Sequence, residues 1–576
     1  MLKASKTFSP LYENITDWPI ARLSRNREAF VQELINMTYS YYSSLSTSEL
    51  KDILSKTIFL ERSRVAEEPW KVDPPKESMY WSKMKNAMFK LSQDLDDEAH
   101  KNFYLNKIRE IISSYSEEIV GTFQPSTFRK GRRILTAIFN RLLNAAANKK
   151  FRRLIGTKYR VQDRLKVYGP IDQIRQLFSK GTVVIVPTHL SNIDSVMVGY
   201  AMDSIMGLPS FSYGAGLNLY NSGAAAYFMN RMGAYRVDRR KKNDIYLQTL
   251  KNFSQLSIEH GVNSLFFPGG TRSRSGEIET QLKMGLLGTA VAAQRALFQK
   301  GRSEKVFIVP LNTSYHFVLE AKYLIDQHLR KSGKEKYFIS RDQSYSIRKS
   351  LKFMWELFSN TSEIHLSFGK PMDVLGYDVD TEGRSRKTGF GKIELKEYFL
   401  QDGQLVQDQQ RDQVYTRKLA SKIVSKYHSE NIILSSHLMA FSLFHMIRSQ
   451  HSELVIYDFL RLNPADYEFS FDEVKTWVEL LRTELLAMEK MGEILVTNSV
   501  AAMEIKSLIY QGIRSLGAYH DKRPIRVTKK TNRIISDNLS LLLFYSNRLA
   551  NYGLESIFYS KLRNVAAEED AKVVTI

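Results

Sequence analysis

The sequence predicts an α/β fold, in which a mixed, largely parallel sheet with flanking helices lies between helical N-terminal and C-terminal regions. Short apolar runs alternate with helical segments from about residue 161 to 375, which is typical of strands joined by helices. The residues before and after this part show helical periodicity. Because 576 residues exceed what one core holds, we divide the chain into a helical region at 1–160, an α/β domain at 161–375, and a linker with a helical region at 376–576.

The alternation within the central part gives the order of its elements. Apolar, β-branched runs predict strands, and the longer amphipathic segments between them predict helices. The strands are expected at 182–187, 234–237, 263–268, 305–316 and 364–371, and the helices at 194–206, 244–261 and 286–299. Residues 376–412 are polar and rich in glycine, which indicates a linker or excursion before the C-terminal helices.

The N-terminal region ends in a basic amphipathic segment from Arg132 to Arg153. Such a helix binds an anionic membrane surface or packs its apolar stripe on the next domain, and both interpretations stay open. The stripe consists of Ile134, Leu135, Ile138, Phe139, Leu142 and Leu143, and the cations are Arg132, Arg133, Arg141, Lys149, Lys150, Arg152 and Arg153.

The composition limits the classes of function. The chain carries 83 Lys and Arg against 61 Asp and Glu, a net charge of +22 that attracts nucleic acid, anionic lipid or phosphorylated small molecules. It has no cysteine, which excludes disulfides, thiolate nucleophiles and cysteine metal sites. No run of 18 apolar residues occurs and the N-terminus lacks the apolar core of a signal peptide, so we expect neither a membrane span nor a cleaved signal.

A histidine and an aspartate follow the first strong strand in "VVIVPTHLSNID". His189 comes directly after the strand, and Asp194 stands five positions later where helical spacing resumes. Of the eleven histidines, only His189 has an aspartate at this offset. A carboxylate that accepts one imidazole N–H fixes the tautomer and raises the basicity of the other nitrogen. The pair therefore predicts a general base. The alternative is a loop histidine and a helix-start aspartate with no shared role, since each of these is common by itself.

Three more strand ends carry chemical groups. "FFPGGTRSRSG" places Gly269 and Gly270 beside arginines 272 and 274, a pattern that favours a phosphate cradle over a solvated surface turn. "GAYRVDRRKK" ends a strand with arginines 236, 239 and 240, of which Arg239 is favoured for a role at the site. In "VFIVPLNTSYH", Pro310 indicates a sheet edge, a bulge or a strand end.

The order and spacing of these four blocks, over about residues 165–375, resemble the glycerolipid acyltransferase family. The sequence after the fourth block, with the long helical regions on both sides, is most similar to bacterial glycerol-3-phosphate acyltransferases. The resemblance implies transfer of an acyl group from acyl-CoA or acyl carrier protein to the sn-1 hydroxyl of glycerol 3-phosphate, which yields lysophosphatidate. It implies no metal and no cofactor beyond the donor substrate.

The resemblance also assigns roles to residues. His189 is the base and Asp194 orients it, and Pro310 of the fourth block is a substrate-binding position. The phosphate is held by Arg239, Arg272 and Arg274, the loop is shaped by Gly270, Thr271 and Ser273, and Lys283 lines the same cavity.

One position departs from the family pattern, because Gly269 stands where the family has a glutamate. A neighbouring carboxylate such as Asp238 takes over, or the acceptor differs, or the activity is weak. Dihydroxyacetone phosphate and lysophosphatidate are the alternative acceptors, and a non-catalytic protein that binds lipid or nucleic acid is the alternative class. The expected partners are glycerol 3-phosphate, the acyl donor and an anionic membrane surface at the cytoplasmic face, with no nucleic acid.

Overall fold

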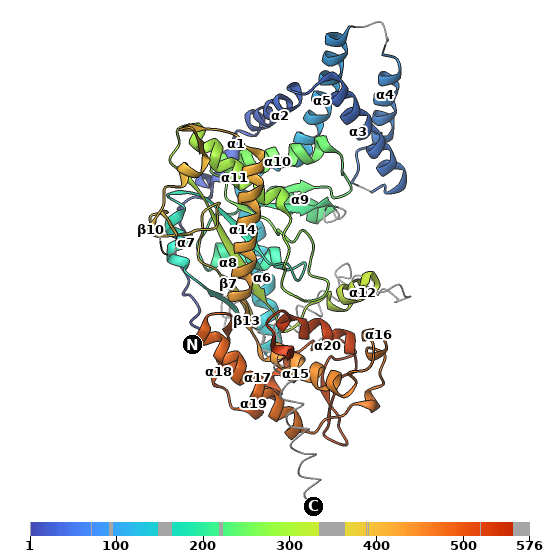
Figure 1. Cartoon of the computed structure of the whole chain (residues 1–576), viewed down its shortest axis with the longest axis vertical. Coiled ribbons are helices and arrows are strands. Elements are labelled where there is room, and N and C mark those ends of the chain that lie inside the picture. The colour runs from blue at the N-terminus through green and yellow to red at the C-terminus, as the bar shows by residue number, and fades with distance from the viewer. Residues whose placement is uncertain are drawn as a thin grey trace, which may run out of the picture.

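The computed structural model describes most of the chain (Figure 1). The residues described are 2–70, 72–91, 96–147, 164–217, 220, 223–332, 363–387, 389, 391–518 and 520–556. In helix α6 the side chains beyond residue 137 lie outside the description, and so do those of residues 223–225 in helix α9. The helices of residues 27–119 lie at one end of the molecule and those of residues 435–546 at the other, with the sheet between them.

The centre is a mixed sheet of seven strands within the described residues, in the order β1-β7-β6-β2-β5-β3-β4. Every neighbouring pair is parallel except β6 and β7, which are antiparallel, so the predicted mixed, largely parallel sheet is confirmed. The strands are β1 Leu165–Tyr168, β2 Gly181–Pro187, β3 Ser212–Gly216, β4 Ala234–Val237, β5 Ser264–Leu265, β6 Lys305–Ser314 and β7 Ile364–Phe368. The sequence patterns did not predict β1 and β3, which are short, and β3 contains two glycines.

Strand β2 is buried on both faces, as its continuous apolar sequence requires. Val183 and Ile185 face one core, while Val184 and Val186 face another, because successive side chains of a strand point to opposite sides. The flanking helices are α7 Ile171–Leu177, α8 Asp194–Ser204, α9 Gly223–Arg231, α10 Asp244–Glu259, α11 Met284–Gln299 and α12 Ala321–Ser332. The helices predicted at 194–206, 244–261 and 286–299 are therefore confirmed.

Pro310 lies inside β6, which is an interior strand. Leu311 pairs with Phe368, but Ile308 pairs with Met372, so the side of β7 carries one extra residue opposite Pro310. This is a β-bulge, one of the three positions that the sequence predicted for a proline in a strand.

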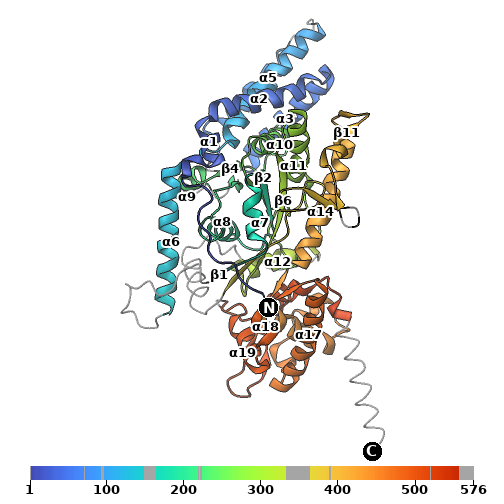
Figure 2. The same ribbon diagram turned by 90° about the vertical axis from the view of Figure 1, so that its left-hand side faces the viewer.

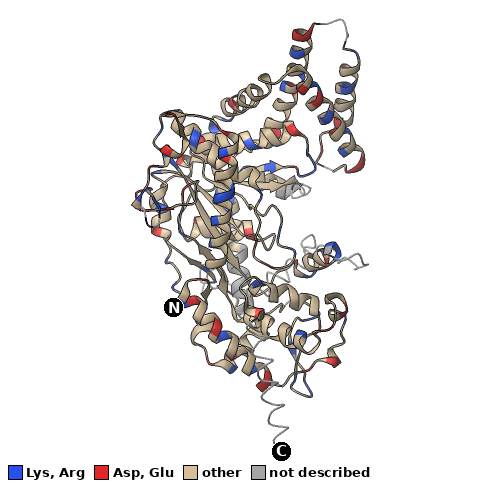
Figure 3. Ribbon diagram, in the orientation of Figure 1, with Lys and Arg blue, Asp and Glu red and all other residues tan. Residues whose placement is uncertain are grey.

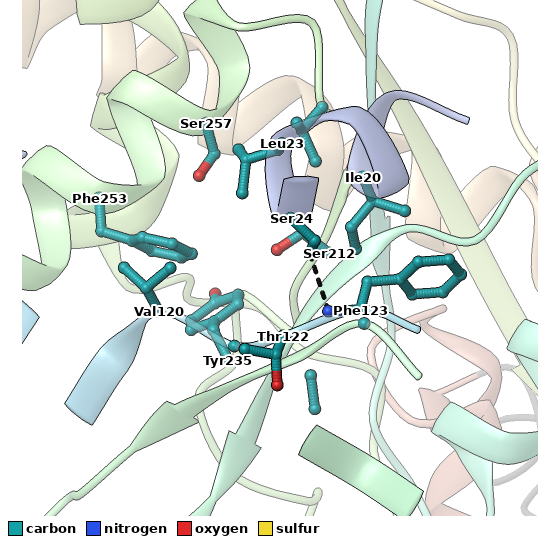
Figure 4. A pocket seen from close by; sticks show the side chains of 14 residues that line it. Ile20, Leu23, Ser24, Val120, Thr122, Phe123, Ser212, Tyr235, Phe253 and Ser257 are labelled. Atoms are coloured by element: carbon teal, nitrogen blue, oxygen red, sulfur yellow. Dashed lines mark hydrogen bonds between the residues drawn. The ribbon is translucent and has the colours of Figure 1, made fainter. Parts of the chain in front are cut away.

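The N-terminal region is helical, as predicted. Its helices are α1 Pro19–Arg25, α2 Arg27–Ser43, α3 Thr47–Glu67, α4 Glu77–Phe89, α5 Asp97–Ile119 and α6 Pro125–Ala147. Helices α2, α3 and α5 share one apolar core with α10 of the sheet domain. Acidic and basic residues are interspersed over these helices in Figure 3. Where α1 and the α5–α6 connection meet β4, a cavity of about 20 Å³ remains, the size of a single water, and Ser24 accepts the Phe123 N–H beside it (Figure 4).

Helix α6 runs along the sheet domain next to α9 (Figure 2). Arg132 forms an ion pair of 3.0 Å with Asp203 of α8, and Phe128 is buried, whereas Ile134 is 48% exposed. Leu135, the other described residue of the predicted stripe, packs against the core of the sheet domain, so the stripe contacts the next domain in part. Arg141, Ile138, Phe139, Leu142, Leu143 and the four cations from Lys149 to Arg153 lie outside the described side chains.

The C-terminal part contains α14 Gln409–Ser429, α15 Ser435–Gln450, α16 Ile456–Phe459, α17 Phe471–Met491, α18 Asn498–Ala502, α19 Ile505–Ser515 and α20 Leu539–Ser546. Helix α14 packs on α11 and β6, and α15 is enclosed by α17, α19 and α20. The polar segment before α14 contains short strands: β8 Asp378–Val379, β9 Ser385–Lys387, β10 Gly391–Lys392, β11 Leu400–Gln401 and β12 Gln404–Leu405. Two further short pairs are β13 Ile432–Ile433 with β14 Leu495–Val496, and β15 Arg526–Val527 with β16 Ile534–Ile535. None of the helices that the structure describes is both long and apolar enough to cross a membrane.

The buried ring of His445 in α15 makes stability depend on pH. Its centroid lies 4.0 Å from that of Phe441, and burial, followed by the charge of Arg448, lowers its pKa to about 3. In the unfolded chain the imidazole titrates near 6.5, so below that pH the unfolded state takes up a proton that the folded state does not. The contribution of His445 to the free energy of unfolding therefore falls as the pH drops from about 6.5 towards about 3.

We predict that His445→Leu removes this dependence. The difference in unfolding free energy between the variant and the wild type should grow in favour of the variant by up to about 1.4 kcal/mol per pH unit below about pH 6.5. Urea unfolding at several pH values from 7.5 to 5 measures the difference. A difference that stays constant over this range would contradict the prediction.

Candidate functional site

The structure brings the predicted His189 and Asp194 together at the carboxyl end of β2. Asp194 is the first residue of α8, and the five-residue turn places its Oδ2 2.8 Å from His189 Nδ1. Since a carboxylate only accepts, the neutral ring carries its proton on Nδ1 and leaves the lone pair on Nε2. Within the described part of the chain, Nε2 has no hydrogen-bond partner. The arrangement is that of a general base.

The Asp194 carboxylate has further donors and is completely buried. Its Oδ2 also accepts the backbone N–H groups of Leu190 at 2.7 Å and Ser191 at 2.9 Å. Its Oδ1 accepts the phenol of Tyr315, at the end of β6, at 2.7 Å. These bonds fix the carboxylate, and through it the plane of the imidazole ring.

The loop after β5 holds His189 from the other side. The ring stacks on Phe267 with centroids 4.1 Å apart. The His189 carbonyl accepts the Ser273 N–H at 2.7 Å, and the His189 N–H donates to Glu279 Oε1 at 2.8 Å. The histidine and the glycine-rich loop therefore form one hydrogen-bonded unit.

Arg272 of the glycine-rich loop is joined to the histidine loop by Glu320, which the sequence analysis did not single out. Arg272 Nη1 lies 3.2 Å from Glu320 Oε1. Glu320 is buried and accepts the Ser191 hydroxyl at 2.8 Å and the Asn192 N–H at 3.0 Å. Burial raises the pKa of Glu320, and the charge of Arg272 opposes the rise. Glu320 thus links Arg272 to the loop that follows His189.

The basic segment after β4 divides into structural cations and one that points to the site. Arg240 binds Asp238 at 2.8 Å and stacks on Trp70 at 3.9 Å, and Lys241 pairs with Glu118. Arg239 is exposed, and its pKa is lowered by desolvation and by the positive charge of Arg272. Two neighbouring guanidinium groups at this edge of the sheet can bind an anion.

A third cation lies over the glycine-rich loop. Gly270 has φ +76°, and a Cβ at this position would lie 2.8 Å from Lys283 Nζ. Only glycine combines this backbone conformation with so close a lysine. Thr271, Ser273 and Arg274 follow in the same loop. Of the predicted set, the structure therefore brings Lys283 to Gly270 and Arg239 to Arg272, while Pro310 lies in the neighbouring strand β6.

Asp238 does not replace the missing side chain at position 269, because it is engaged with Arg240. The carboxylate beside Gly269 belongs to Glu279, whose Cγ would lie 3.1 Å from a Cβ at position 269. This corrects the prediction made for Asp238, which rested on nearness in sequence to the arginines.

The C-terminal helical region supports the end of β6. The guanidinium of Arg548 is buried and donates to Asn312 Oδ1 at 2.6 Å and to the Thr313 carbonyl at 2.8 Å. The ring of His437 lies 3.2 Å from the Tyr315 carbonyl. Both contacts fix the position of the backbone segment that places Tyr315 against Asp194. The sequence patterns did not single out Tyr315 or Arg548, because their partners lie more than 100 positions away along the chain.

An apolar cavity of about 300 Å³ adjoins the first turn of α8. Asn192 and Ser195 line it close to Asp194, and Arg132 with Asp203 is the charged pair in its wall. The remaining lining comes from α6, α8, α9, β3 and nearby loops and is mostly apolar: Phe128, Leu135, Val196, Gly199, Tyr200, Met202, Pro209, Ser210, Phe211, Tyr213, Phe228, Met229, Met232 and Leu265. Its shape and lining suit a hydrocarbon chain. Among the described residues, no group of three or more His, Asp or Glu is placed to hold a metal ion.

Comparison with known proteins gives a consistent result. Residues 164–314 match the Acyltransferase family model, which covers β1 to β6 with all four sequence blocks. The predicted resemblance to the acyltransferase family is therefore confirmed, and the sheet with its flanking helices contains an acyltransferase domain.

Three relatives carry the name glycerol-3-phosphate acyltransferase. The protein of Alteromonas mediterranea is 26% identical over 46% of this chain and 28% of its own length. The protein of Haemophilus ducreyi is 26% identical over 50% of this chain and 31% of its own length. The protein of Pseudoalteromonas translucida is 27% identical over 54% of this chain and 34% of its own length. The match with this chain thus spans about a third of the length of these relatives.

Proposed function

We propose that the acyltransferase domain transfers a fatty acyl group from a thioester to the sn-1 hydroxyl of glycerol 3-phosphate, giving lysophosphatidate. The observation that carries the proposal is the His189–Asp194 pair, whose Nε2 is open, beside the cationic edge formed by Arg239, Arg272 and Lys283. A base next to an anion site suits an acceptor that joins a hydroxyl to a phosphate. The names of the relatives support the same substrate.

In the proposed reaction, His189 Nε2 removes the hydroxyl proton while the oxygen attacks the thioester carbonyl. The new C–O bond gives a tetrahedral intermediate, which collapses with cleavage of the C–S bond. The imidazolium returns its proton to the leaving thiolate, so a free thiol and the acyl ester are formed. Asp194 stabilises the imidazolium, as a buried carboxylate does in related dyads. The steps need no covalent acyl-enzyme and no cofactor.

The acceptor and the donor are distinguished by direct assay. Dihydroxyacetone phosphate and lysophosphatidate also present a phosphate and a hydroxyl, and both acyl-CoA and acyl carrier protein present a thioester. The purified protein is given each acceptor with each donor, and the products are separated. Formation of lysophosphatidate from glycerol 3-phosphate supports the proposal, and its absence with both donors would overturn it.

We predict that His189→Ala lowers kcat by about 10²–10⁴-fold, because this is the usual contribution of a positioned base. Asp194→Asn should also remove most of the activity, since the ring loses its charged partner. The matched control is His260→Ala, because His260 forms an exposed pair with Glu33 at the same distance of 2.8 Å. A rate above about a tenth of wild type in His189→Ala would contradict the role of the base.

We predict that Arg239→Ala raises the KM for glycerol 3-phosphate at least about tenfold and leaves the KM for the acyl donor nearly unchanged, because a charge-assisted bond to phosphate is lost. Arg272→Ala should act in the same direction. Lys242→Ala is the control, since Lys242 is exposed in the same basic segment. Equal changes in both KM values would mean that the arginines serve the structure alone.

The apolar cavity supports a fatty acyl donor and predicts how chain length is selected. A Cβ at Gly199 in α8 would meet no atom within 4 Å, and Gly199 lines the cavity, so Gly199→Met introduces a long apolar side chain at its wall. We expect the variant to prefer shorter acyl chains, measured as the ratio of kcat/KM for two chain lengths. Gly285→Met is the control, because Gly285 in α11 is equally free of neighbours but lies outside the cavity. An unchanged ratio of kcat/KM would mean that the acyl chain does not bind in this cavity.

We also propose that the protein works at the cytoplasmic face of a membrane, bound peripherally through the segment from Arg133 to Arg153. Each cation near an anionic leaflet contributes about 1 kcal/mol, screened by salt. Arg132 is excluded because Asp203 pairs with it. We expect sedimentation with anionic liposomes that weakens in high salt and when Arg133, Arg141, Lys149, Lys150, Arg152 and Arg153 are all neutralised. Liposome binding that is unchanged by high salt and by neutralisation of these residues would contradict the proposed role of this segment.

A further inference from the structure

We propose that Glu279 is a positioning residue for the base: its carboxylate occupies the space that a side chain at position 269 would fill and holds the peptide of His189 in place. This inference rests on the proposed function. It assigns a role to a residue that lies outside the four sequence blocks, ten positions beyond the glycine that departs from the pattern.

Glu279 is the residue that a side chain at position 269 would contact first. Among the described glycines with positive φ, Gly270 is present and Gly269 is absent, so the backbone at 269 does not itself demand glycine. A Cβ at position 269 would instead lie 3.1 Å from Glu279 Cγ and 3.3 Å from its Oε1. Position 269 and Glu279 therefore compete for one space, and a carboxylate can enter it from either position.

The contact that Glu279 makes from this space concerns the base directly. Its Oε1 accepts the backbone N–H of His189 at 2.8 Å, while the Ser273 N–H binds the carbonyl of the same residue at 2.7 Å. The His189 residue is thus held at both of its backbone polar groups. A carboxylate acceptor makes this bond shorter and stronger than a neutral one would be. Loss of the acceptor would leave the N–H unsatisfied and let the ring move relative to the thioester.

The surroundings of Glu279 fit a fixed carboxylate. Burial raises its pKa, and the His189 N–H, its own N–H and the charges of His189 and Arg548 oppose the rise. Tyr427, which is buried on the same side, donates to the Val186 carbonyl at 2.8 Å, and its pKa is raised by burial and by the charge of Glu279. Glu279 therefore contacts the histidine loop, while Tyr427 binds the strand that leads into it.

The test is a double-mutant cycle on positions 269 and 279. Glu279→Ala should lower kcat by about a hundredfold with little change in either KM, because the base is displaced and the binding groups remain. Glu279→Gln keeps an oxygen acceptor and should retain activity within about tenfold. Gly269→Glu should lower kcat, since two carboxylates would share one space. The double variant Gly269→Glu/Glu279→Ala should recover at least about tenfold over the worse single variant.

A second measurement does not depend on turnover. Hydrogen exchange of the His189 amide should become faster in Glu279→Ala and slow again in the double variant, because a carboxylate from position 269 again accepts this N–H. Glu277→Ala, two residues away in the same segment, should change neither the exchange nor kcat.

The outcomes separate the two proposals. A double variant that is no more active than the worse single variant, with His189 exchange still fast, would overturn the role of Glu279. An inactive wild type with the expected exchange pattern would overturn the proposed reaction and leave the structural pairing of positions 269 and 279 standing. Wild-type rates and slow exchange in Glu279→Ala would also refute the positioning role.

Discussion

The carboxylate of Asp194 is the point on which the site depends. It binds the ring of His189, two N–H groups of the turn between them, and the phenol of Tyr315 from a strand 121 positions away. A buried carboxylate is costly unless it is satisfied in this way, so each donor is held to its position. The turn after β2 and the end of β6 are consequently fixed to each other, and the base is oriented by the same bonds that keep the charge stable.

The two helical regions serve this centre through buried polar groups. On one side, Arg240 pairs with Asp73 and Lys241 with Glu118 of α5, which ties the segment after β4 to the N-terminal region. On the other side, Arg548 fixes the residues that precede Tyr315. Breaking a buried pair on one partner is costly because it strands the other charge. The helices of both regions therefore hold the segments that carry the site residues in position.

How much the sequence predicts depends on whether a feature is local. The unbroken apolar run of β2 predicts a buried strand. The spacing of His189 and Asp194 predicts their contact, because one turn can bring them together. Strand β3, with its two glycines, carries no such pattern, and neighbouring strands define it instead. Tyr315, Glu320 and Arg548 are ordinary residues in the sequence. Only the fold brings Tyr315 and Glu320 to the loop of His189, and Arg548 to the end of β6. Glu279 could have been suspected from the glycine at 269, but its distance from that glycine is set by the loop.

The arginines of the site differ in their pairing with carboxylates. Glu320 neutralises Arg272 on the side of the histidine loop, and Glu279 faces the backbone of His189, so neither carboxylate is available to Arg239. Desolvation, followed by the positive charge of Arg272, lowers the pKa of Arg239, so the two guanidinium groups lie near each other. In the proposed reaction, the phosphate of the acceptor would offset the like charges of the two arginines as it forms its own bonds with them.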